Sequence, residues 1–223
     1  MKAHTKETQS TMTPEKALQF LKEGNERFVS NLKLNRNLLQ QVNETSEGQF
    51  PFAIVLSCID SRTSAELTFD QGLGDIFSAR ISGNIINEDI LGSMEFACKV
   101  AGSKLIVVLG HTSCGAIKGA CDHVEMGNLT GLVKKIAPSV DAVKYYGVRT
   151  SKNPEFVEMV AEDNVLRMVN EIKEKSSILR EMIEKGEIGL AAGMYNVESG
   201  VVNFYDQAND NHKVLNEELA GKH

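Results

Sequence analysis

The chain has 223 residues, of which 42% are hydrophobic and 24% are charged, and its formal net charge is -6. This composition is ordinary for a globular protein with one large domain or two small ones. The negative balance and the scattered Lys and Arg residues argue against nucleic acid and anionic membranes as partners. No apolar run approaches the roughly 20 residues that a membrane helix needs.

The cysteines and the N-terminus indicate a reducing compartment. Four cysteines are too few for a disulfide scaffold in a chain of this size, so metal binding, catalysis or burial is expected of them. The polar segment up to Thr13 has no apolar core of a secretory signal, which favours a cytoplasmic location. A chain from which a leader had already been removed would look the same.

Residues 1–50 are predicted to form an N-terminal helical arm. The first 12 residues are polar and expected to be mobile. The tripeptide Thr13-Pro14-Glu15 is typical of a helix start, and apolar residues at helical spacing follow it to Val29. Residues 31–47 are polar and are expected to form a loop with at most one helical turn. Such an arm can cover its own domain or extend to a second subunit.

Residues 51–223 are predicted to form a single α/β domain. Two continuous apolar runs, 52–57 and 104–109, are typical of strands buried on both faces of a parallel sheet. Further strands are expected at 75–80 and 188–195, with an antiparallel partner at 201–205 and helices between them. A loop is expected around Pro138. The fold class is therefore a mostly parallel sheet with an antiparallel edge strand and helices on both faces.

Two of the predicted strands end in residues that carry chemistry. The first runs directly into Cys58-x-Asp60-x-Arg62, and the strand at 104–109 into His111-x-x-Cys114. Because ligands bind at the carboxyl ends of strands in open α/β sheets, these side chains are expected to converge if the strands are neighbours. Two thiolates and one imidazole favour zinc, and three protein ligands leave the open position of a catalytic site.

Asp60 has two possible roles at such a site. It could close the metal site as a fourth ligand, or accept a hydrogen bond from a zinc-bound hydroxide and so orient it. Arg62 favours the second role, because its guanidinium can hold Asp60 in a paired, ionised geometry. Taken alone, Cys58 would be interpreted as a core residue and the Asp60–Arg62 pair as a surface ion pair.

These motifs resemble those of the β-class carbonic anhydrases. The matching segments are residues 57–62, 74–80, 83–84 and 108–116. The resemblance implies one zinc per chain on Cys58, His111 and Cys114, with a catalytic Asp60–Arg62 dyad. It implies reversible hydration of carbon dioxide to bicarbonate and a proton. It also implies a homodimer, or a tetramer of dimer units, with the arm packed on the partner subunit.

The resemblance extends to a substrate pocket. It implies substrate contacts by Gln49, Phe77 and Phe96, the last at a position where several relatives have tyrosine. One subgroup of the family has a tryptophan that helps build a regulatory bicarbonate site. This chain has no tryptophan, and Val55 aligns with that position. The regulatory site is therefore expected to be absent or altered, and the zinc to stay open to water at neutral pH.

Two alternative functions share the same motifs. One is hydrolysis of carbon disulfide or carbonyl sulfide, as in close relatives of the family. The other is a non-catalytic zinc or thiol-sensing protein in which Asp60 closes the metal site. A complete Asp60–Arg62 pair argues against the second, because a purely structural site has no need of the arginine.

Overall fold

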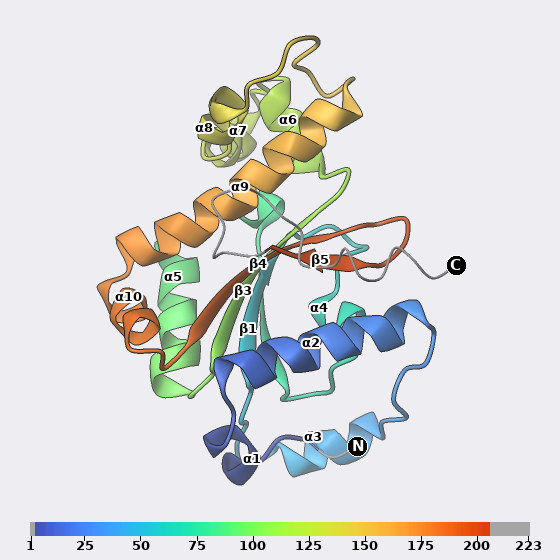
Figure 1. The fold of residues 1–223 in the computed structure, drawn as a ribbon, viewed down its shortest axis with the longest axis vertical. Helices are drawn as coiled ribbons and strands as arrows, with labels where there is room; N and C mark the ends of the chain where they lie inside the picture. Colours follow the sequence, from blue (N-terminus) through green and yellow to red (C-terminus); the bar gives the residue numbers. More distant parts are fainter. Residues whose placement is uncertain (1–2, 206–223) are drawn as a thin grey trace.

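The computed structural model describes residues 3–205, which form a five-stranded sheet flanked by helices (Figure 1). The strand order is β2-β1-β3-β4-β5; the first four strands are parallel, and β5 is antiparallel to β4. The strands are β1 (Ala53–Ser57), β2 (Ile76–Arg80), β3 (Leu105–His111), β4 (Gly189–Tyr195) and β5 (Val202–Phe204). The predicted fold class, with its antiparallel edge strand, is confirmed.

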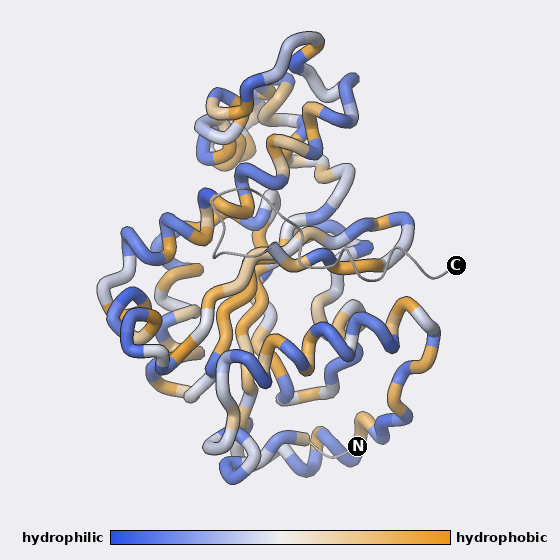
Figure 2. Tube along the Cα trace, in the orientation of Figure 1, coloured by the Kyte–Doolittle hydropathy of each residue, from blue (hydrophilic) through white to orange (hydrophobic). Residues whose placement is uncertain are grey.

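Helices cover both faces of this sheet, so its two central strands are buried throughout. Side chains alternate along a strand, which sends Ile54 and Leu56 into one core and Ala53 and Val55 into the other. In Figure 1, the long α9 crosses the sheet on the side of the core that contains Ile54 and Leu56. Helix α2 crosses it on the side of the core that contains Ala53 and Val55. Figure 2 shows the central strands as a continuous hydrophobic segment between these amphipathic helices.

The arm contains more helix than its sequence predicts. Its helices are α1 (Lys6–Ser10), α2 (Pro14–Val29) and α3 (Leu38–Glu44). The bounds of α2 agree with the prediction, whereas α1 lies in the segment expected to be mobile and α3 is longer than one turn. Thr5 and Asn37 cap these two helices with their side chains, which stabilises short polar segments that have little apolar periodicity.

The rest of the chain supplies the helices between the strands. They are α4 (Ala65–Thr68), the 3₁₀ turn η1 (Ser82–Asn84), α5 (Glu88–Glu95), the π-helical η2 (Phe96–Val100), α6 (Gly115–Cys121), α7 (Gly127–Val133), α8 (Ala137–Ala142), α9 (Pro154–Lys175) and α10 (Ser177–Glu184). The loop expected around Pro138 is wrong, because Pro138 lies in the first turn of α8, where a helix needs no N–H donor. Among residues 3–205, no helix is long and apolar enough to cross a membrane.

Candidate metal centre

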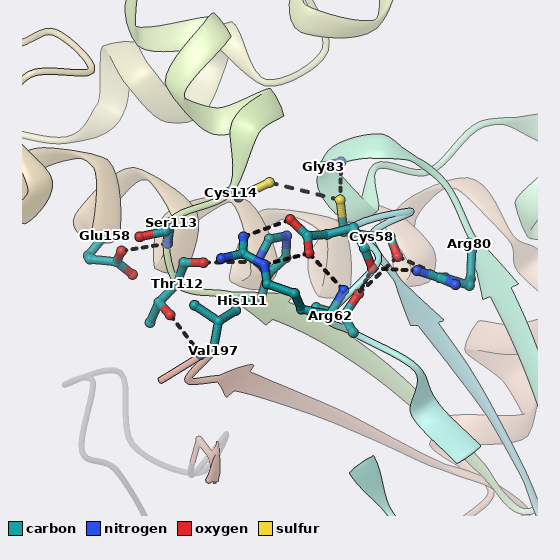
Figure 3. Close-up of polar contacts among 12 residues, drawn as sticks. Cys58, Arg62, Arg80, Gly83, His111, Thr112, Ser113, Cys114, Glu158 and Val197 are labelled. Atoms are coloured by element: carbon teal, nitrogen blue, oxygen red, sulfur yellow. Dashed lines mark hydrogen bonds and ion pairs between the residues drawn. The ribbon is translucent and has the colours of Figure 1, made fainter. Parts of the chain in front are cut away.

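Three predicted ligands converge at the carboxyl edge of the sheet. Cys58 follows β1 directly, His111 is the last residue of β3, and Cys114 is the N-cap residue of α6. Because β1 and β3 are adjacent parallel strands, the two loops leave the same edge side by side. The ligand atoms of these three buried residues all lie within 4.8 Å of one another (Figure 3).

The geometry of this group fits a tetrahedral zinc ion. The sulfur atoms of Cys58 and Cys114 are 4.0 Å apart, and two thiolates on a tetrahedral zinc would be about 3.8 Å apart. His111 places Nδ1 2.9 Å from the carbonyl oxygen of Thr112, so Nδ1 carries the proton and donates it. Its Nε2 atom is buried and has no hydrogen-bond partner among the described residues. That orphaned nitrogen faces two sulfurs and is suited to a metal.

Cys58 differs from the other three cysteines in the direction of its pKa shift. The Cys114 thiol donates to the sulfur of Cys58, which lowers the pKa of Cys58 to about 4 and raises that of Cys114. The N–H of Gly83, 3.3 Å from the Cys58 sulfur, also favours the thiolate. Burial instead raises the pKa of Cys98 to about 12 and that of Cys121 to about 11. Cys58 is therefore ready to bind a cation, and the last two thiols are inert core residues.

Asp60 is turned towards Arg62. The guanidinium donates from Nε to Oδ1 at 2.9 Å and from Nη2 to Oδ2 at 2.8 Å, and the Arg62 backbone N–H donates to Oδ1 at 3.0 Å. These bonds, chiefly those from the Arg62 side chain, hold the pKa of Asp60 well below its usual range. The carboxylate is thus paired with Arg62 and does not belong to the group of converging ligand atoms found among the described residues.

Arg80, at the end of β2, supports the loop that carries Cys58. Its Nε donates to the carbonyl oxygen of Cys58 at 2.9 Å and its Nη2 to that of Asp60 at 2.6 Å. Thr63 donates its hydroxyl to the same Asp60 oxygen at 2.9 Å. Arg80 lies in the segment 74–80 that resembles the family, but nothing in the sequence near Cys58 points to its contact with this loop 22 residues away. The pairing of parallel β1 with β2, which places Arg80 beside Ser57, is the signal that could have found it.

A pocket of about 300 Å³ opens onto the metal centre. Asp60 and Ser82 are its polar lining side chains, and most of the rest of the wall is apolar or backbone. The lining residues are Cys58, Ile59, Asp60, Ser82, Gly115, Ala116, Gly119, Leu129 and Val133. A space of this size and polarity suits a small uncharged molecule next to Cys58, which is the ligand residue in its lining.

The three residues predicted to contact substrate lie elsewhere in the chain. The rings of Phe77 and Phe96 are 6.2 Å apart and line a second pocket, of about 740 Å³, against β2 and α5. Gln49 is exposed and precedes the amino end of β1, whereas Cys58 follows its carboxyl end. Within one chain the structure does not bring these residues to the metal centre, and their substrate contacts stay predictions.

A sheet-edge ligand set of two cysteines and one histidine, beside a small apolar pocket, is that of a catalytic zinc protein. The family model for carbonic anhydrases matches residues 53–202. The chain is 37% identical over 195 residues to carbonic anhydrase 2 of Mycobacterium tuberculosis, which covers 84% of this chain and 90% of that protein. It is 32% identical over 203 residues to a carbonic anhydrase of Mycolicibacterium smegmatis, covering 88% and 96%.

A similar solved structure indicates the same family as these related sequences. The β-carbonic anhydrase CcaA shares 25% identity at a TM-score of 0.69, covering 88% of this chain and 98% of that one. A β-carbonic anhydrase of Sordaria macrospora, described as tetrameric, shares the fold at 19% identity and a TM-score of 0.66, covering 85% and 96%. The chain therefore belongs to the β-class carbonic anhydrase family. It is an enzyme that hydrates carbon dioxide, as its motifs predicted.

Proposed function

We propose that the enzyme works with one zinc ion per chain, held by Cys58, His111 and Cys114, and that Asp60 and Arg62 orient the nucleophile. The supporting observation is the convergence of three buried ligand atoms within 4.8 Å, with His111 Nε2 left without a hydrogen-bond partner within residues 3–205. A zinc ion held by these three residues would supply Lewis acidity, which brings the pKa of a water molecule bound to zinc to about 7 and makes it a nucleophile near neutral pH.

Asp60 has the chemistry of an orienting group. Its carboxylate, held by two bonds from the Arg62 guanidinium, accepts hydrogen bonds and does not donate them. An attacking O–H group beside the three ligands therefore points its proton at Asp60 and its lone pair away from it. Asp60 also lines the pocket, so an O–H group that it orients lies next to the space for substrate.

The apolar part of the pocket accounts for the substrate class. Ala116, Leu129 and Val133 offer no hydrogen bonds through their side chains, which suits carbon dioxide, a small molecule without a dipole. The product bicarbonate is an anion, and these side chains do not stabilise its charge, which favours its release. Carbonyl sulfide and carbon disulfide are also small and apolar, so they are the competing substrates to compare.

We also propose a homo-oligomer, a dimer or a tetramer of dimer units, in the cytoplasm. The arm supports the assembly, because Leu32, Leu38, Leu39 and Val42 are exposed apolar residues on one short segment. All four cysteines are free, as expected in a reducing compartment. Sedimentation of the purified enzyme tests the assembly, and a monomer at micromolar concentration would contradict it.

Metal analysis combined with stopped-flow kinetics tests the zinc site. We expect one zinc per wild-type chain, none in Cys58→Ser, and wild-type content in the matched control Cys98→Ser, whose buried thiol lies outside the ligand group. The loaded wild-type enzyme should hydrate carbon dioxide across pH 7 to about 9, where metal-bound water ionises. Full zinc content in Cys58→Ser would contradict the ligand set. Faster turnover of carbonyl sulfide or carbon disulfide than of carbon dioxide would show that the assigned substrate is wrong.

A further inference from the structure

One peptide group connects helix α9 to the histidine of the metal centre. The carbonyl oxygen of Thr112 accepts the proton of His111 Nδ1 at 2.9 Å. The N–H of Ser113, which belongs to the same peptide unit, donates to Glu158 Oε1 at 2.9 Å. Glu158 lies in the first half of α9, and Figure 3 shows these groups in line from the carboxylate to the imidazole.

This order of groups carries an electrostatic effect from Glu158 to His111. A carboxylate that accepts from a peptide N–H polarises the peptide and makes its carbonyl oxygen more negative. That oxygen then accepts more strongly from Nδ1–H, because hydrogen bonds in a chain reinforce one another, by roughly 10–30% each. Metal-binding histidines commonly donate their second nitrogen to a carboxylate or a carbonyl, which fixes the ring and strengthens the metal bond.

The loop is also fixed by contacts on its other side. Thr112 donates its backbone N–H to Tyr195 O at 3.0 Å, and its hydroxyl accepts the N–H of Val197 at 3.0 Å. The β4–β5 connection thus holds Thr112 in place from that side, and the following residue, Ser113, has a left-handed φ of 57°. What Glu158 adds to this position is negative charge.

We propose that Glu158 is a positioning residue of the zinc site. It acts on His111 through the Thr112–Ser113 peptide and strengthens the bond between His111 Nε2 and the metal. The inference rests on the proposed zinc site. Glu158 is half-buried and Ser113 is exposed, so water screens part of the charge. The effect is therefore smaller than the 10–100-fold loss of metal affinity that follows loss of a direct partner.

Glu158→Gln separates charge from hydrogen bonding. The amide oxygen of glutamine still accepts from Ser113 N–H, so the loop keeps its geometry while the charge is lost. We expect about 5-fold weaker zinc affinity in competition with a chelator, below the usual range for direct partners. In the NMR spectrum of the metal-free protein, the His111 Nδ1–H resonance should move upfield. Glu158→Ala, which removes both charge and acceptor, should weaken zinc binding further.

Glu171→Gln is the matched control. It makes the same charge change on the same helix, 13 residues and about 20 Å further along, where Glu171 pairs with Lys175. We expect wild-type zinc affinity and an unmoved His111 resonance. Wild-type values for Glu158→Gln, or an equal loss in Glu171→Gln, would overturn the proposal. A wild-type chain that binds no zinc would instead overturn the metal site itself, whereas the NMR comparison does not depend on metal.

Discussion

Asp60 lies two residues from Cys58, a proposed zinc ligand, yet its carboxylate is directed at Arg62. The main-chain N–H of Arg62 and two atoms of its guanidinium all donate to the carboxylate, which gives Asp60 one orientation. A carboxylate fixed in this way is a weak base, because each bond stabilises its charged form. In the proposed mechanism its contribution to the reaction is therefore geometric, as an acceptor in a fixed place.

Asp60→Asn tests this geometric role. The amide can donate as well as accept and pairs poorly with Arg62, so the attacking O–H loses its single orientation. We expect carbon dioxide hydration to fall about 100-fold, the lower end of what a positioned proton-handling group contributes, with unchanged zinc content. Stopped-flow hydration and metal analysis measure the two quantities.

The matched control is Asp141→Asn, an exposed aspartate on α8 that should leave both values unchanged. Wild-type turnover in Asp60→Asn would remove Asp60 from the mechanism. A loss of zinc in that variant would instead indicate that Asp60 contributes to metal binding.

The residues that could be predicted from sequence are those that local rules place. Alternation after a buried strand puts Cys58 and Asp60 at one sheet edge, and a second apolar strand does the same for His111. Arg80 and Glu158 follow no such rule. Arg80 bonds to the backbone of Cys58, 22 residues away in the sequence, and Glu158 to the backbone of Ser113, 45 residues away. Any residue type offers such backbone groups. Only the folded arrangement reveals these contacts.

At the scale of elements, the turn η1 connects the loop that carries Cys58 to α9 through hydrogen bonds. The N–H of Gly83 donates to the Cys58 sulfur, and its carbonyl oxygen accepts from Asn164 Nδ2 at 2.9 Å. Gly83 has a φ of 69°, and a Cβ there would lie 2.7 Å from Ile136 Cδ1. The sequence pair Gly83-Asn84 predicts a turn, but its role as a donor to the metal centre depends on packing against α8 and α9.

Gly83→Ala should therefore destabilise the protein. The left-handed backbone and the crowded Cβ together cost about 1–3 kcal/mol of unfolding free energy. Urea unfolding of the metal-free protein measures this change. The control is Gly131→Ala in α7, where a Cβ meets nothing within 4 Å. That substitution should stabilise by about 0.5–1 kcal/mol, because alanine is the better helix former. Equal effects at both positions would contradict the packing argument.

Helices and strands were predicted correctly where the apolar periodicity is strong. The predictions failed where capping residues determine whether a short helix forms. The strands and α2, with their apolar patterns, were predicted to within a few residues. The short helices α1, α3 and α8 depend on cap side chains and on a proline at a helix start, and their patterns resemble those of loops. Their local signals were too weak to outweigh polar composition.

At the scale of the whole molecule, the arm is attached to its own chain through α2. Leu21 is fully buried in the core that contains Ala53 and Val55. Burial of this side chain contributes about 1.5–3 kcal/mol to the free energy of folding. At Gly24 there is no room for a Cβ beside the carbonyl group of Phe69. One face of the arm is thus used within the chain. The exposed apolar residues between Leu32 and Val42 remain for the predicted partner subunit.

A buried carboxylate beside α4 fixes the polar end of this arm. Asp70 is 4% exposed and accepts bonds from Arg27 Nε at 2.7 Å, from the Leu34 N–H at 3.2 Å and from Arg36 Nη1 at 2.5 Å. Burial by itself would raise the pKa of Asp70, but these hydrogen bonds outweigh it and lower the pKa below its ordinary value.

The sign of the linkage follows from that lowered pKa. The unfolded chain protonates Asp70 near pH 4, whereas the folded chain holds the charge to lower pH. The stabilisation is therefore complete above about pH 4 and is lost as the pH falls through the folded-state pKa. Asp70→Asn removes the charge at every pH and leaves two arginines without it, which should cost about 3 kcal/mol at pH 7.

Urea unfolding of the wild type and Asp70→Asn, compared at each pH from 7 to 3, measures this linkage. The gap between the two unfolding free energies should stay constant down to about pH 4 and narrow below it. Other acid-sensitive groups, including the metal ligands, affect both proteins alike and cancel in the difference. A gap that stays constant to pH 3, or one that is absent at pH 7, would show that Asp70 does not fix the arm through its charge.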